Sequence, residues 1–161
     1  MHFSGIFEYR FVLTGVFSLL FIISQGLAGQ SVVVPRPDQE VILVTGSTGG
    51  LGREVARRLG SQGAHVIVHG RSSERGNELV EEIIAAGPGS ARFYRADFAS
   101  LRQIRELGER ILMDYGRLDV LVNNAGFGSA PNERMVSEDG HELRFQVNYL
   151  AGFLLTKLLR P

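Results

Sequence analysis

Residues 41–52, VILVTGSTGGLG, place a short apolar run directly before a loop that contains four glycines. The run Val41–Val44 is rich in β-branched residues, which predicts a strand buried on both faces of a parallel sheet. From Leu51 to Leu59 apolar side chains recur at helical spacing, which predicts an amphipathic helix. A glycine loop between a buried strand and a helix is typical of a dinucleotide-binding unit, because glycine permits a tight turn beside a pyrophosphate.

The same alternation of strand and helix continues along the chain. Ser100 and Gln103 form a capping-box pattern at the start of one of the helices. Further strands are expected at residues 65–70, 91–97 and 118–126, and a last helix is expected from about Glu138 to Arg160. This order predicts an α/β fold, a Rossmann-type doubly wound parallel sheet with strand order 3-2-1-4 and a crevice between strands one and four.

Composition narrows the classes of function. The 161 residues include 17 basic and 17 acidic ones, and the formal charge of +0 gives no electrostatic case for a nucleic-acid partner. Hydrophobic residues make up 44% of the chain, which is enough for a core. The absence of cysteine excludes disulfides, thiolate metal sites and a cysteine nucleophile. The four histidines lack the spacing of a metal site, so no metal is expected.

Four motifs occur in the order of a known family. Residues 45–52, TGSTGGLG, resemble the TGxxxGxG motif of the short-chain dehydrogenase/reductase family. Residues 123–126, NNAG, resemble that family's NNAG motif, and Asp97 stands where its adenine-contacting aspartate follows the third strand. Residues 145–159 resemble the helix that carries the family's catalytic asparagine, here Asn148. Two longer stretches are similar to the retinol-dehydrogenase-like branch of the family: residues 96–107, ADFASLRQIREL, and residues 139–159, DGHELRFQVNYLAGFLLTKLL.

The resemblance implies roles for individual residues, with Asn148 catalytic. Each role also has a simpler interpretation: Asn123 forms a turn, Asp97 caps a helix, or Asn148 is a bonded core amide. Such an amide needs a partner in the middle of an apolar helix, since an unsatisfied one costs roughly 1–3 kcal/mol. The residues expected to bind the cofactor are Thr45, Gly46, Ser47, Gly50, Leu51, Gly52, Arg71, Ser72, Asp97, Asn123, Ala125 and Gly126.

The end of the second predicted strand bears on the choice of cofactor. A dinucleotide fold that binds NAD usually places an acidic residue on the ribose 2′-hydroxyl about 20 residues past the glycine turn. This chain has no acid at residues 68–70, and Arg71 follows with Ser72 beside it. A guanidinium pairs well with a 2′-phosphate, so NADP is predicted over NAD. The alternative is that Arg71 is a solvated loop residue.

The family's serine and Tyr-x-x-x-Lys pair are not found in this chain. None of its four tyrosines is followed by lysine four residues later, and Lys157 is its only lysine. We therefore expect an N-terminal fragment truncated before strand five, without dehydrogenase activity by itself. The whole protein is expected to be an oxidoreductase whose substrate is an alcohol or carbonyl compound of lipophilic character. Its oligomeric state stays open. The alternative is a non-catalytic nucleotide-binding or interaction module that ends at Pro161.

The N-terminal segment is expected to lie outside the fold. Residues 11–23 are mostly apolar after Arg10, and small residues around Ala28 resemble a signal-peptide cleavage site. Extended through Val34, the span of about 24 residues is long enough to cross a bilayer. We therefore divide the chain into an anchor or signal segment at 1–30, a linker at 31–40 and a partial dinucleotide-binding domain at 41–161. Because a dinucleotide is abundant inside the cell, membrane association with the domain facing the cytosol is favoured; export after cleavage near Ala28 is the alternative.

Overall fold

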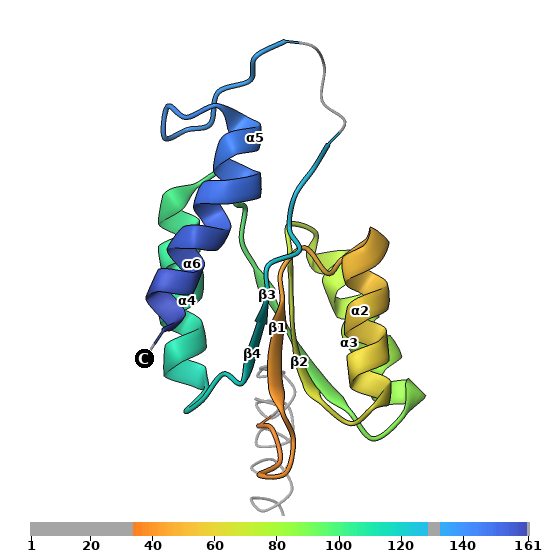
Figure 1. Ribbon diagram of the computed structural model, residues 1–161. Helices are drawn as coiled ribbons and strands as arrows, with labels where there is room; N and C mark the ends of the chain where they lie inside the picture. Colours follow the sequence, from red (N-terminus) through yellow and green to blue (C-terminus); the bar gives the residue numbers. More distant parts are fainter. Residues whose placement is uncertain (1–33, 129–132, 161) are drawn as a thin grey trace, which may run out of the picture. The chain divides into compact units, whose positions relative to one another are not determined.

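A computed structural model describes residues 34–128 and 133–160 (Figure 1). The predicted anchor or signal segment at residues 1–30 lies outside these described residues. Within the described ranges, no helix has the length and apolar character needed to cross a membrane.

The described chain forms a four-stranded parallel sheet in the order β3-β2-β1-β4. The predicted α/β fold and strand order are therefore confirmed. Because β1 pairs with β2 on one side and with β4 on the other, the chain changes direction across the sheet at β1 (Figure 1). The strands are β1 (Val41–Val44), β2 (His65–Gly70), β3 (Ser90–Arg95) and β4 (Val120–Val122).

Helices cover both faces of this sheet and build two cores. Side chains alternate along β1, so Val41 and Leu43 enter the core beneath α4 and α6, whereas Ile42 and Val44 enter the core beneath α2 and α3. Burial on both faces explains why the strand sequence is continuously apolar. The helical elements are α2 (Gly50–Ser61), α3 (Ser73–Ala86), α4 (Leu101–Asp114), α5 (Leu143–Phe145), the π-helix η1 (Gln146–Leu150) and α6 (Ala151–Leu159).

The last predicted helix begins later than expected. Residues 137–142 form a turn in which Gly140 has a φ of +82°, and Val136 makes an isolated antiparallel bridge with Glu142. The Glu142 carboxylate then accepts from the backbone N–H groups of Arg144 and Phe145, which starts the helix at Leu143. The predicted start at Glu138 was wrong because helical spacing of the apolar residues does not reveal this cap.

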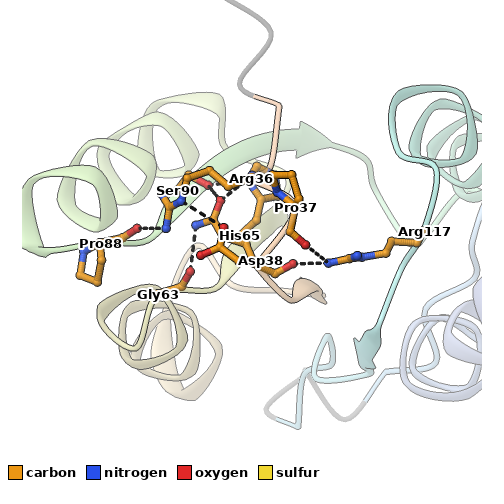
Figure 2. Close-up of polar contacts among 9 residues, drawn as sticks. Arg36, Pro37, Asp38, Gly63, His65, Pro88, Ser90 and Arg117 are labelled. Carbon is orange, nitrogen blue, oxygen red and sulfur yellow. Dashed lines mark hydrogen bonds and ion pairs between the residues drawn. The ribbon is translucent and has the colours of Figure 1, made fainter.

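The described part of the predicted linker is attached to the sheet by side-chain hydrogen bonds (Figure 2). Arg36 donates to the Pro88 carbonyl at 3.0 Å, and Gln39 donates to the Gly63 carbonyl at 2.8 Å. Arg117 donates in turn to the Gln39 carbonyl at 2.5 Å. Residues 36–39 are therefore held at the edge of the sheet where the strands begin.

A buried histidine in β2 continues this polar network. The Ser90 hydroxyl donates to Gln39 Oε1 at 3.0 Å, so its oxygen accepts from His65 Nδ1 at 2.8 Å. His65 Nε2 is then the unprotonated nitrogen, which accepts from the Tyr115 hydroxyl at 2.9 Å. Burial lowers the pKa of His65 to about 4. The neutral ring thus links β2, β3 and the end of α4.

Candidate functional site

A cavity of about 720 Å³ opens at the carboxyl ends of the strands. It lies beside the ends of the neighbouring strands β1 and β4, whose following helices α2 and α6 cover opposite faces of the sheet. This is the usual ligand position in an open α/β fold. A volume of this size suits a small organic ligand or cofactor. Its wall comes from residues within 46–52 after β1, 69–71 at the end of β2, 96–99 after β3 and 124–127 after β4, together with Arg75, Met135, Leu143 and Val147.

The glycine loop forms one side of this cavity. Gly46 and Gly50 have φ values of +66° and +55°, a region that other residues adopt only with strain. A Cβ on Gly46 would lie 2.8 Å from the Ala125 Cα, and a Cβ on Gly52 would lie 2.6 Å from the Gly46 carbonyl oxygen. Nothing lies within 4 Å of the Cβ position of Gly50. The first and third glycines therefore permit close packing, and Gly50 leaves backbone open to a ligand.

The N-terminus of α2 faces the same space. Its N-cap residue, Gly49, makes no side-chain capping bond, and the first turn contains no acidic residue. The open N–H groups and the positive end of the helix dipole suit a phosphate. Leu51 is 74% exposed and lines the cavity, so its predicted place in the apolar stripe of α2 was wrong. The first turn of α2 projects past the ends of the strands, where the sheet does not cover it.

Thr45 holds the segment after β4 against the loop. Its buried hydroxyl oxygen accepts from the backbone N–H groups of Asn124 and Ala125, both at 3.0 Å. The Asn124 side chain donates back to the Thr45 carbonyl at 2.9 Å. The two motifs at residues 45–52 and 123–126 thus form one hydrogen-bonded unit.

Two arginines lie near the end of β2: Arg71 follows the strand, and Arg75 lies in the first turn of α3. Arg71 and Arg75 are exposed and line the cavity, and their guanidinium groups make no ion pair or hydrogen bond within the described chain. Ser72 does not line the cavity; its hydroxyl caps α3 by accepting from the Arg75 N–H at 3.3 Å. Arg95 donates from Nε to the Arg71 carbonyl at 3.0 Å. The cavity therefore has a positively charged rim on this side.

Asp97 lines the cavity from the turn after β3. Its carboxylate accepts from the Ala99 N–H at 3.0 Å, while Ser100 is the N-cap of α4. Gln103 accepts from the Asp97 N–H at 3.0 Å, so the expected capping box is only half formed. Ser100 accepts from the Gln103 N–H, but the Gln103 side chain fixes Asp97 instead of returning to Ser100.

Asn148 lies in the π-helix η1 and its side chain is exposed. Its Oδ1 accepts from the Phe127 N–H and its Nδ2 donates to the Phe127 carbonyl, both at 3.0 Å. The alternative interpretation of Asn148 is therefore confirmed in one part: the amide is bonded to neighbouring backbone. Its expected place in the core of a continuous helix was wrong, because the side chain is exposed and lies in a π-helix. The wider turn of the π-helix presents Asn148 to the backbone after β4. Asn123 instead donates to the Thr156 hydroxyl at 3.1 Å.

The cavity brings together most of the residues predicted from the sequence. Those that line it are Gly46, Gly50, Leu51, Gly52, Arg71, Asp97, Ala125 and Gly126. Those that do not line it are Thr45, Ser47, Ser72, Asn123 and Asn148. The second group supports the wall by the hydrogen bonds described for Thr45, Ser72 and Asn148.

Comparison with known proteins assigns the family. Residues 40–161 match the model of the short-chain dehydrogenases. The chain belongs to the short-chain dehydrogenase family. It is 49% identical over 122 residues to a Streptomyces sp. (strain C5) protein named as a candidate daunorubicin C-13 ketoreductase, covering 74% of this chain and 41% of the relative. It is 39% identical over 131 residues to retinol dehydrogenase 14 of Mus musculus, covering 74% and 39%.

A solved structure gives the same result. The chain is similar to a metagenomic short-chain oxidoreductase in complex with NADP, with a TM-score of 0.65 and 36% identity, covering 74% of this chain and 54% of that one. The resemblance expected from the four motifs is therefore confirmed, including its likeness to retinol dehydrogenases. The chain spans about two fifths of the length of the curated relatives named above.

Sequence reasoning missed several residues of this short-chain dehydrogenase site. His69 and Phe98 line the cavity but belong to none of the four motifs, and Thr48 lines it from a variable position of the TGxxxGxG motif. Gln146 is fully buried and donates to the Phe98 carbonyl at 3.3 Å and to the Asp139 carboxylate at 2.8 Å. At Gln146 and at His69 a polar residue interrupts an apolar run of sequence. Such a residue indicates a side chain that needs a buried hydrogen-bond partner.

Proposed function

We propose that the whole protein is an NADP(H)-dependent oxidoreductase for alcohol or carbonyl groups and that this chain binds the cofactor. The observation that carries the proposal is the cavity, in which an open glycine loop and two exposed arginines lie at the ends of neighbouring strands. A relative that is 36% identical contains NADP in its solved structure, which supports this assignment.

The glycine loop fits the pyrophosphate of a dinucleotide. Gly50 has open space where a side chain would begin, and α2 starts without a capping side chain or an acid that would compete with an anion. Backbone N–H groups at a helix N-terminus bind phosphate through hydrogen bonds and the helix dipole. Gly46, Gly50 and the first turn of α2 would therefore hold the pyrophosphate.

The rim at the end of β2 fits a 2′-phosphate. Arg71 follows β2 and Arg75 lies in the first turn of α3, both without side-chain partners in the described chain, and Arg95 supports the Arg71 backbone. The neighbouring residues His69 and Gly70 carry no carboxylate that would accept a ribose 2′-hydroxyl or repel a phosphate. This charge arrangement favours NADP(H) over NAD(H).

The reaction needs a hydride carrier and a proton-transfer group. A bound nicotinamide supplies or accepts the hydride. Asn148 is neither an acid nor a base near neutral pH, so in this proposal it holds the Phe127 backbone beside the cofactor. The serine, tyrosine and lysine implied by the family resemblance are proposed to lie in the part of the protein that corresponds to the unmatched length of its relatives.

The substrate is proposed to be a lipophilic alcohol or carbonyl compound. This follows from the likeness to retinol dehydrogenase 14, whose name indicates a lipophilic alcohol. Attachment to a membrane through residues 11–34, with the domain facing the cytosol, is proposed from the apolar N-terminal sequence.

Cofactor preference tests the proposal. In the full-length protein, kcat/KM should be higher for NADPH than for NADH, and Arg71→Ala should remove most of that difference by raising the KM for NADPH. NADH kinetics are the internal control, because NADH carries no 2′-phosphate for Arg71 to bind. Equal kcat/KM values for the two cofactors in the parent enzyme would contradict the proposal.

A further inference from the structure

His69 is a buried polar residue beneath the glycine loop. It is the penultimate residue of β2, its side chain is 3% exposed, and it contributes to the cavity wall. Its ring stacks on Phe98, with the ring centroids 4.5 Å apart and the planes 25° from parallel. Phe98 follows β3, so the ring lies between the segments that leave β1, β2 and β3.

His69 is the residue of β2 to which the loop is bonded. The Gly46 N–H donates to its Nδ1 at 3.1 Å, and the Ser47 N–H donates to its carbonyl at 2.8 Å. The His69 N–H donates in turn to the Ser47 hydroxyl oxygen at 3.0 Å. Backbone and side chain of one residue thus fix the first two residues of the loop.

The direction of the Gly46 bond determines the form of the ring. Because Gly46 donates to Nδ1, that nitrogen is unprotonated and the neutral ring carries its hydrogen on Nε2. Nε2 is the buried side-chain polar atom without a hydrogen-bond partner in the described chain. Burial lowers the pKa of His69 to about 4, so Nδ1 remains an acceptor at neutral pH.

The Gly46 N–H has little freedom to find another acceptor. Gly46 holds a φ of +66° and its α-carbon is packed against Ala125, so the peptide before it cannot turn without moving the loop. Without an acceptor at position 69, this N–H group would be left unpaired in the interior, which a folded chain avoids by rearranging. The rearrangement would displace the backbone that leads to Gly50.

We propose that His69 is a positioning residue for NADP(H), acting through the bond from the Gly46 N–H to its Nδ1. The inference rests on the proposed function and adds to it a residue that belongs to none of the motifs. The same residue is two positions before Arg71, so it ties the loop for the pyrophosphate to the rim for the 2′-phosphate.

Two substitutions separate the hydrogen bond from packing. His69→Phe keeps an aromatic ring against Phe98 but removes the acceptor, whereas His69→Asn loses the ring but places an oxygen at the position of Nδ1. In the full-length protein, NADPH Kd from fluorescence titration should rise about tenfold in H69F and stay within about threefold of the parent in H69N. The KM for NADPH should follow Kd, with kcat nearly unchanged. Should H69F not fold, His69→Leu takes its place as the acceptor-free variant.

His65 provides the matched control. It is a second buried histidine of β2, but its ring bonds to Ser90 and Tyr115 and not to the loop. His65→Phe should lower the melting temperature and leave NADPH Kd unchanged. A readout without cofactor is hydrogen exchange of the Gly46 amide, which should be faster in H69F and unchanged in H65F.

The outcomes distinguish the two proposals. If the parent binds NADPH and H69F binds it equally tightly, the role of His69 is refuted and the proposed function stands. If H69F and H69N are weakened equally, the ring acts by packing and the inference is also overturned. Unchanged exchange of the Gly46 amide in H69F would overturn it independently of any cofactor. If the parent does not bind NADPH, the proposed function fails and the inference fails with it.

Discussion

Alanine at Gly46 and at Gly50 should have different effects on stability, although both glycines have a left-handed backbone. The left-handed conformation costs a residue with a Cβ roughly 1–2 kcal/mol, and this cost is common to both substitutions. At Gly46 the new Cβ also meets the Ala125 Cα at 2.8 Å, and such overpacking adds roughly 1–3 kcal/mol. At Gly50 there is no atom within 4 Å to meet. We therefore expect a loss of unfolding free energy of about 2–5 kcal/mol for G46A and about 1–2 kcal/mol for G50A.

Cofactor binding should be sensitive to alanine at Gly50, although stability is less sensitive there than at Gly46. The space at Gly50 is the space proposed for the pyrophosphate, so a methyl group there should raise NADPH Kd at least tenfold, about 1.4 kcal/mol, in a protein that remains folded. The assays are denaturant unfolding of the full-length protein, compared at constant m-value, and NADPH titration. If G46A is no more destabilising than G50A, the contact with Ala125 does not constrain the loop. If G50A binds NADPH as the parent does, the glycine loop is only a turn.

Two further predictions concern the buried histidines and the π-helix. The pKa values of His65 and His69 are lowered to about 4, so the unfolded chain takes up protons first as pH falls below about 6.5. Unfolding free energy should be flat above that pH and fall between about 6.5 and 4, with a smaller slope in H65F; an unchanged slope would show that His65 does not contribute. Asn148→Asp keeps the acceptor for the Phe127 N–H but loses the donor to its carbonyl, whereas Asn148→Ala loses both. Hydrogen exchange at Phe127 should therefore be fast in N148A and intermediate in N148D, and equal rates in all three proteins would contradict the role assigned to Asn148.

The fold was predictable because its signals are local and repeated. The runs 41–44 and 65–70 are short, β-branched and bounded by glycine or polar residues, and two parallel strands so close in sequence require a helix between them. The strand order followed from handedness rules and not from any single residue. The element boundaries were less predictable. β4 covers only Val120–Val122, because the Asn124 N–H donates to the Thr45 hydroxyl and to the Val122 carbonyl instead of to the neighbouring strand.

The candidate site was predictable where the chemistry needs glycine or a family motif. Gly46 and Gly50 were found because a positive φ and an open backbone exclude side chains, and this constraint is visible in sequence. Leu51 was assigned to both the apolar stripe and the cofactor site, and only its place in the fold decides between them. The turn before α5 was missed, because the cap by Glu142 depends on a backbone conformation that helical spacing does not encode.

The side chains that hold the cavity wall share a physical property: each is a polar group that comes from one element and fixes the wall formed by another. Thr45 after β1 holds the backbone after β4, His69 in β2 holds the loop after β1, and Gln146 in η1 holds the turn after β3. None of these pairs is close in sequence, so no local pattern can show them. Because a buried hydrogen-bonding group is costly to leave unpaired, each such bond also fixes one strand end relative to another. Cofactor affinity in this fold should therefore respond to residues that act through the backbone of another element, and His69 is the one whose side chain bonds the glycine loop directly.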